Sequence, residues 1–120
     1  MGLTLLLFTS SSCEKIVGEG PVVTENRTAP AFNGLSVSVP AEAHFTQSPD
    51  YKITLQAQQN ILDEIETVVS DNVLKIRFRH SNTNIRNSEK IIVRVQGTEA
   101  RLLELNGSGS LDVEGTIDPA

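Results

Sequence analysis

The stretch Tyr51–Ala57 reads YKITLQA, and its pattern decides the fold class. Apolar and polar side chains alternate along it at every step, with Ile53, Leu55 and Ala57 on one side. Successive side chains of a β-strand point to opposite faces, so a period of two gives one buried face and one wet face. The stretch is therefore predicted to be a β-strand that covers a core on one side only.

The same alternation recurs along most of the chain. Turn-forming residues separate the alternating stretches, such as Pro40 after one of them and Ser48–Asp50 after another. The further stretches with a period of two are Leu35–Val39, Ala43–Phe45, Leu74–Arg79 and Ile91–Gln96. This spacing predicts an all-β domain of short strands.

Residues 60–66 interrupt this rhythm. Ile61, Leu62 and Ile65 are spaced as on one face of a helix. Asn60 precedes them and suits the N-cap position, and acidic residues would then fall in the first turn, near the positive end of the helix dipole. We expect at most one short helical turn near residues 60–66, and an irregular loop is the alternative.

A glycine-rich corner lies near the end of the chain. Leu103 and Leu105 lead into Asn106–Ser110, after which Leu111 and Val113 resume the alternation. Glycine tolerates positive φ and suits a sharp corner between two strands. The order of strand, corner and strand predicts a coil that turns onto the next rung of a stacked sheet.

Composition limits the function classes. The chain has 120 residues, about one domain, with 10 Lys and Arg against 15 Asp and Glu and a formal net charge of −5. A nucleic-acid-binding domain needs a concentrated basic patch to neutralise phosphates, so this class is excluded. One Cys and two distant His residues exclude a disulfide framework and a Cys-rich zinc site. We expect no cofactor and no metal site.

The N-terminus carries a candidate export and anchoring signal. An apolar run from Leu3 to Phe8 and a row of small residues precede Cys13, the single cysteine. This order is typical of a lipoprotein-type signal peptide over residues 1–12, with lipidation of Cys13. The alternative is a free or buried cysteine after an apolar N-terminal strand, since Ser10 stands where a strict lipobox has Leu. Residues 13–30 contain Gly and Pro and are predicted to be a tether or a leading edge strand.

One group of basic residues is a candidate binding surface. Lys75, Arg77 and Arg79 alternate along one strand face. With Arg94 alongside, they form a candidate ligand-facing basic stripe for an anionic glycan or a lipid headgroup. The alternative is a solvated face whose charges protect a sheet edge.

The remaining titratable residues favour structural roles. His44 lies on the polar side of its stretch and His80 opens a polar segment, and we expect both side chains to be solvated rather than ligands or bases. The acidic residues Asp63, Glu64 and Glu66 are expected to complement the helix dipole. Carboxylates at residues 112 and 114 suit calcium, but no complete calcium-binding loop surrounds them. No catalytic residue is predicted.

Several short segments together resemble a known family. They are Arg27 before Phe32–Val37, Phe45–Ser48 before Tyr51–Leu55, Asn60–Ile65, Val73–Ile76 and Leu103–Gly109. Their order and spacing, from Arg27 to Gly115, resemble the head GIN domain family of auto-transporter adhesins, lipoprotein-type domains common in Bacteroidetes.

The resemblance implies a fold. Members are all-β coils of short strands that resemble a right-handed β-helix, and residues 31–120 would be the N-terminal part of such a domain. In the family the Gly-Ser-Gly corner usually starts further rungs, so the chain is expected to be a truncated part of a longer protein. If it is complete, its last strand leaves an open sheet edge that favours self-association.

The resemblance also implies a function. We expect a lipid-anchored, non-enzymatic binding domain of the cell envelope, an adhesin by family, held by Cys13 as an outer membrane lipoprotein. Its partners would be the membrane and a protein or glycan ligand, and the periplasmic and the surface-facing orientation both stay open. The alternatives are an assembly subunit that pairs through its sheet edge and an envelope glycan-processing enzyme.

Overall fold

The computed structural model describes residues 14–80, 83–86 and 89–114. Its regular secondary structure is almost entirely β-strand, with a single helical turn, so the predicted all-β class is confirmed. The strands are β1 (Glu14–Val17), β2 (Val22–Arg27), β3 (Gly34–Val37), β4 (Ala41–Gln47), β5 (Lys52–Gln58), β6 (Ile65–Ser70), β7 (Val73–Phe78), β8 (Thr83–Arg86), β9 (Ile91–Gly97), β10 (Leu102–Leu105) and β11 (Gly109–Glu114), and the helix is α1 (Gln59–Leu62).

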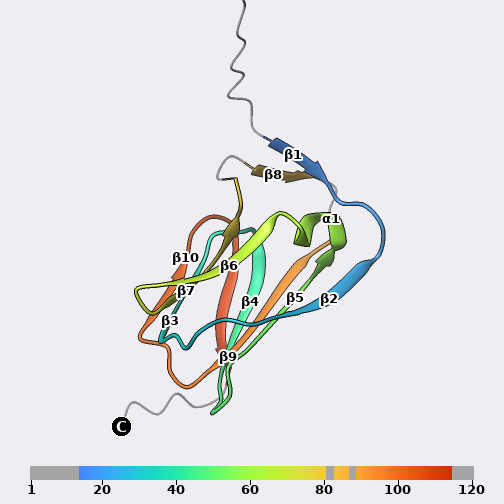
Figure 1. The fold of residues 1–120 in the computed structure, drawn as a ribbon. Helices are drawn as coiled ribbons and strands as arrows, with labels where there is room; N and C mark the ends of the chain where they lie inside the picture. The colour runs from blue at the N-terminus through green and yellow to red at the C-terminus, as the bar shows by residue number, and fades with distance from the viewer. Residues whose placement is uncertain (1–13, 81–82, 87–88, 115–120) are drawn as a thin grey trace, which may run out of the picture.

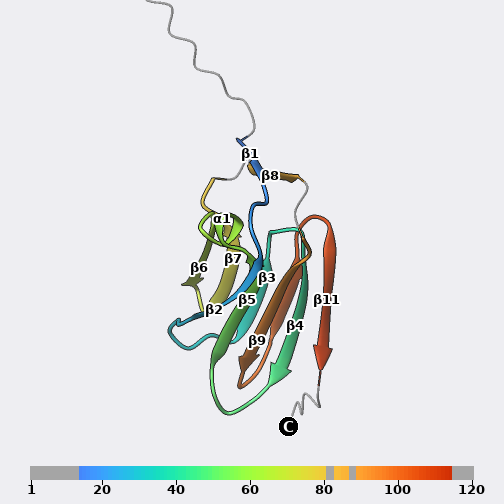
Figure 2. The same ribbon diagram turned by 90° about the vertical axis from the view of Figure 1, so that its right-hand side faces the viewer.

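The strands form two main sheets and a small ribbon (Figure 1). The four-stranded sheet has the order β10-β3-β7-β6, and the five-stranded sheet has the order β11-β4-β9-β5-β2. The two sheets lie face to face, and the β1-β8 ribbon stands apart from them at one end (Figure 2). Each main sheet therefore has one face toward the other sheet and one toward solvent.

Three pairs of strands repeat the same step from one main sheet to the other; a corner joins two of the pairs, and the segment with β8 joins the third. β3 with β4, β7 with β9, and β10 with β11 each begin in the four-stranded sheet and continue in the five-stranded one. Equivalent strands pair in parallel and in register, so Leu35 lies beside both Leu74 and Leu103. However, β2, β5 and β6 pair antiparallel, and both main sheets are mixed and open. The predicted right-handed β-helix-like coil is therefore not confirmed.

The core lies between the two main sheets and follows the period of two. Ile53, Leu55 and Ala57 of the alternating stretch are buried, as the pattern predicts. Tyr51 is the exception, since its side chain is 40 % exposed and packs edge-to-face on Phe32, with ring centroids 5.0 Å apart. The core residues are Phe32, Leu35, Val37, Val39, Ala41, Ala43, Phe45, Ile53, Leu55, Ala57, Ile61, Leu62, Ile65, Leu74, Ile76, Ile91, Val93 and Val95.

The helical turn begins earlier than predicted. Its N-cap is Gln58, so the N-cap predicted at Asn60 is wrong. The helix ends at Leu62, and therefore Asp63 follows it and no acidic residue lies in its first turn. Asn60 has another partner. Its side-chain amide donates to the carbonyl of Val17 (2.7 Å) and accepts from the backbone N–H of Glu19 (3.0 Å), and so holds the end of β1.

The segment before the core contains two strands. β2 pairs antiparallel with β5 as the edge strand of the five-stranded sheet, which matches the edge-strand alternative for this segment. β1 pairs in parallel with β8 in the separate ribbon. The predicted signal peptide over residues 1–12 and the predicted lipidation site Cys13 lie outside the described residues.

Candidate binding surfaces

Two corners bring parallel strands close together at one end of the five-stranded sheet. The chain passes from β3 to β4 at Pro40 and from β10 to β11 at the predicted glycine-rich corner. Gly109 has a φ of 132°, and a Cβ at this position would lie 2.3 Å from the carbonyl oxygen of Ala41. Only glycine allows this backbone approach, so Gly109 sets the register of β11 on β4.

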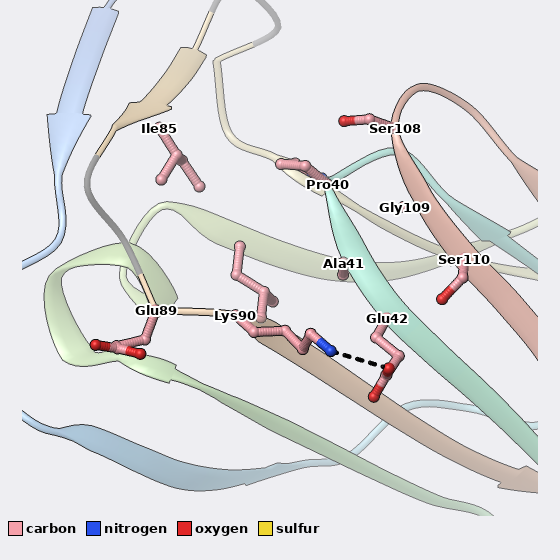
Figure 3. A pocket seen from close by; sticks show the side chains of 10 residues that line it. Pro40, Ala41, Glu42, Ile85, Glu89, Lys90, Ser108, Gly109 and Ser110 are labelled. Carbon is pink, nitrogen blue, oxygen red and sulfur yellow. Dashed lines mark hydrogen bonds and ion pairs between the residues drawn. The ribbon is translucent and has the colours of Figure 1, made fainter.

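A pocket of about 370 Å³ opens at these corners (Figure 3). Ile85 projects toward it from β8, and Lys90 reaches across it to Glu42. The pocket is lined by Pro40, Ala41, Glu42, Ile85, Glu89, Lys90, Ile91, Ser108, Gly109 and Ser110. Its volume is at the lower end of the range for small-ligand sites, and its lining mixes apolar side chains with hydroxyl and charged groups.

A chain of ion pairs runs from this pocket along the solvent face of the five-stranded sheet. Lys90 Nζ lies 3.2 Å from Glu42 Oε1, and Glu42 Oε2 lies 3.2 Å from His44 Nε2. His44 Nδ1 lies 2.9 Å from Asp112 Oδ1 on the neighbouring strand β11. The network therefore links β4, β11 and the residue before β9 through alternating basic and acidic side chains.

The network keeps Glu42 ionised. The side-chain hydrogen bond with His44 is the largest cause that holds the pKa of Glu42 below its ordinary value, followed by the hydrogen bond and the positive charge of Lys90. A carboxylate with two such partners stays charged at neutral pH and orients both of them.

His44 is less solvated than expected. Its side chain is 15 % exposed and lies between the carboxylates of Glu42 and Asp112. Glu42 is two residues before His44 and shares its face, so the period of two could have indicated this contact. The contact with Asp112 depends on the pairing of β11 with β4, which local sequence does not encode.

No metal site or membrane-spanning helix is found in the part of the chain that the structure describes. Among residues 14–80, 83–86 and 89–114, no three His, Cys, Asp or Glu side chains cluster so that they could hold a metal ion. The only described helix is α1, and it is too short to cross a membrane.

A second cavity, of about 360 Å³, lies on the solvent face of the four-stranded sheet. Ser36 and Ser38 come from β3 and the residue after it, Lys75 and Arg77 from β7, and Glu104 from β10. The Lys75 ammonium makes no hydrogen bond or ion pair with any described residue. We call this cavity the serine groove; it offers a ligand hydroxyl groups, the carboxylates of Asp71 and Glu104, and the Lys75 ammonium, which pairs with no described side chain.

The structure brings together only part of the predicted basic stripe. Lys75 and Arg77 lie on β7 and Arg79 follows it, but Arg94 lies on β9 in the five-stranded sheet, beside His44. Arg94 is therefore not alongside the other three. Arg77 pairs with Glu66 (Nε–Oε1 2.8 Å), so Lys75 is the cation of the serine groove without a partner among the described side chains.

Two arginines bind the carbonyl groups at the end of α1. Arg27 donates to the carbonyls of Leu62 (2.8 Å) and Ile65, and Arg79 donates to the carbonyl of Asp63 (2.9 Å). The last carbonyls of a helix have no intrahelical partner, so Arg27 supplies a donor to Leu62, the last residue of α1, while the other two bonds hold the C-cap residue Asp63 and the start of β6. The sequence does not indicate this role, because no local pattern links Arg27 to a turn so far along the chain.

A sequence profile described as "Putative auto-transporter adhesin, head GIN domain" matches residues 31–119. The chain belongs to this family. The head GIN domain therefore includes all the strands from β3 to β11, both pockets and the ion-pair network.

Solved structures share the fold of this head GIN domain. An adhesin from Bacteroides fragilis has a TM-score of 0.77 at 20 % identity, with 85 % of this chain and 47 % of that chain covered. A protein from Parabacteroides distasonis, described as lipid binding, has a TM-score of 0.76 at 19 % identity, with 84 % and 44 % covered. An adhesin from Parabacteroides merdae has a TM-score of 0.74 at 18 % identity, with 84 % and 42 % covered.

The chain thus spans less than half the length of these three solved structures. The comparison with curated proteins found no match.

Proposed function

We propose that this head GIN domain is a lipid-anchored, non-enzymatic binding domain of the bacterial cell envelope, an adhesin held as an outer membrane lipoprotein by Cys13. The family description and the adhesin names of two structural relatives support the binding role. The apolar run before the single cysteine supports the anchor.

The serine groove carries the binding proposal. It combines the Lys75 ammonium, which pairs with no described side chain, with the hydroxyls of Ser36 and Ser38, which accept hydrogen bonds from Asn106 and can still donate to a ligand. Hydroxyls and a cation together suit a hydroxyl-rich ligand that carries a carboxylate or a phosphate, as acidic glycans and glycolipid headgroups do. Arg77 contributes less, because Glu66 already neutralises it.

Binding to an array of neutral and acidic glycans tests this proposal. The unaltered chain is expected to bind acidic glycans, and Lys75→Glu is expected to abolish that binding because the anion would face a carboxylate. Lys52→Glu is the matched control, since Lys52 is an exposed cation on the other main sheet. Equal binding by Lys75→Glu and Lys52→Glu, with circular dichroism unchanged, would overturn the groove as the ligand site.

The surroundings of His44 support the non-enzymatic proposal. A histidine that activates a nucleophile needs one ring nitrogen free to take a proton. Both ring nitrogens of His44 face carboxylates, on Glu42 and on Asp112. Ser110 lines the corner pocket, whereas His44 is not among the residues that line it.

Processing of the precursor tests the anchor. Cys13→Ala is expected to leave an unprocessed, unlipidated precursor, and globomycin is expected to have the same effect on the unaltered chain. An unchanged mass and unchanged membrane fractionation in both experiments would contradict lipidation at Cys13. Protease treatment of intact cells then distinguishes a surface-facing from a periplasmic domain.

Assembly through a sheet edge is the second candidate function. β10 and β11 are the edge strands of the two main sheets on the same side of the molecule. Leu102 and Val113 are 43 % and 37 % exposed there, and unpaired strand edges with apolar side chains favour strand addition. Sedimentation velocity over a concentration series would show a dimer, and Val113→Lys would be expected to remove it. A monomer at every concentration would exclude this function for the chain.

A further inference from the structure

We propose that the β1-β8 ribbon is a membrane-contact surface that binds anionic lipid headgroups through Lys15 and Arg86 and so orients the domain on the membrane. This inference rests on the proposed anchor, because β1 begins one residue after Cys13. The part of the domain that lies closest to the lipidated cysteine also lies closest to the membrane surface.

The register of the ribbon separates its two faces. Ile16 pairs with Ile85, and both side chains pack against the core of the domain. Residues alternate along a strand, so Lys15 and Val17 on β1, with their neighbours Asn84 and Arg86 on β8, lie on the opposite face. All four of these residues are exposed.

The ribbon is attached to the domain through hydrogen bonds on β1 and the segment after it. Asn60 holds the carbonyl of Val17 and the N–H of Glu19, and Gln58 donates to the carbonyl of Gly20 (2.8 Å). The ribbon stands beyond the two main sheets in both views (Figures 1 and 2). Because the ribbon is fixed to the domain by these bonds, contacts of the ribbon with lipid would also fix how the whole domain is oriented on the membrane.

The charge of this face is opposite to that of the whole chain. The chain carries a formal net charge of −5, yet the exposed face of the ribbon carries two cations. Lys15 and Arg86 make no ion pair with any described residue, so both charges are available to phosphate groups. Val17, 46 % exposed between them, can enter the interfacial region of the bilayer. The acidic residue Glu19 lies beyond the ribbon, where its backbone is bound to Asn60.

Vesicle binding by the full-length Cys13→Ser chain, which carries no lipid, tests the proposal. Vesicles of phosphatidylcholine alone are compared with vesicles that also contain phosphatidylglycerol. We expect stronger binding to the anionic vesicles than to the neutral ones, and this difference is expected to fall about fivefold for each of the two basic residues removed in Lys15→Gln/Arg86→Gln. The control Lys52→Gln/Arg94→Gln removes two exposed cations from the five-stranded sheet and is expected to bind as the parent does.

Equal binding to neutral and anionic vesicles would overturn the proposal, as would an equal loss in the control variant. Amide hydrogen exchange of the same complexes provides a second readout. Residues 14–17 and 83–86 are expected to gain protection on anionic vesicles, and no gain there would also overturn it. The Cys13→Ser chain cannot be lipidated, so a negative result with vesicles says nothing against lipidation at Cys13. Conversely, a negative result in the precursor-processing experiment does not change what the vesicle experiment measures.

Discussion

At the scale of single residues, Gly109 decides how closely two strands approach. Its φ is 132°, and a Cβ added there would lie only 2.3 Å from the Ala41 oxygen, which leaves no room for a side chain. Gly109→Ala is expected to destabilise the domain by roughly 2 kcal/mol or more, from backbone strain and the clash together. Urea unfolding measures this change.

Gly107→Ala is the matched control for this substitution. Gly107 also has a positive φ, 103°, but no atom lies within 4 Å of the added Cβ. Its cost is therefore limited to the backbone strain. Equal destabilisation by the two substitutions would show that the close approach of β11 to β4 does not contribute to the effect of Gly109→Ala.

The low pKa of Glu42 predicts how stability depends on pH. Its pKa is lowered in the folded state from an ordinary value of 4.5, so its contribution is complete above that value and is lost as pH falls through the lower, folded value. Glu42→Gln is therefore expected to lower the unfolding free energy at pH 7 and to have a progressively smaller effect as the pH falls below 4.5. An effect that stays equal as the pH falls would contradict the ion-pair role of Glu42.

Arg27 is expected to be the most important charged side chain for stability. It donates to two backbone carbonyls and to Glu25, and its side chain is only 17 % exposed. Arg27→Ala would leave the carbonyls of Leu62 and Ile65 without donors, at a cost of about 2–3 kcal/mol. Arg101→Ala is the control: its side chain is 73 % exposed and pairs only with Glu99, so its cost should be within about 0.5 kcal/mol. Thermal unfolding compares the two.

At the scale of elements, Asn60 connects α1 to the β1-β8 ribbon. Asn60→Ala removes both of its side-chain hydrogen bonds, to Val17 and to Glu19. We expect faster hydrogen exchange in β1 and β8, with global stability lowered by about 1 kcal/mol. Gln59→Ala, which loses only a bond to Asp63 on the surface, should leave the exchange of the ribbon unchanged.

The strands were predictable from sequence, but their neighbours were not. A period of two depends only on which side of a strand is buried, so Ile53, Leu55 and Ala57 were assigned correctly. The pairing of strands depends on contacts between distant segments. For this reason the sequence grouped Arg94 with Lys75, although the structure places them in different sheets. The error at Asn60 has the same origin, since its partners lie on the distant strand β1 and the residues after it.

At the scale of the whole molecule, the family could be predicted because several segments, each only weakly specific for the family by itself, occur in a fixed order. The profile match to residues 31–119 confirms that assignment. The open, mixed sheets differ from the expected coil, because β2, β5 and β6 add antiparallel strands to the parallel units. The serine groove was only partly predictable, since it needs the side-by-side placement of β3, β7 and β10.

The stacked units also bear on how such a domain can diversify. Leu35, Leu74 and Leu103 form a row on the core side of the four-stranded sheet, while Ser36, Lys75 and Glu104, each one residue later, form a row on its other side, where Ser36 is buried and the other two are at least partly exposed. Every second position can therefore vary in charge and size without disturbing the interior. Neighbouring residues in the sequence therefore differ in what they contact, because one packs in the interior and the next lies on the outer side of the sheet, so substitutions at the outer positions can change what the domain binds while its scaffold stays the same.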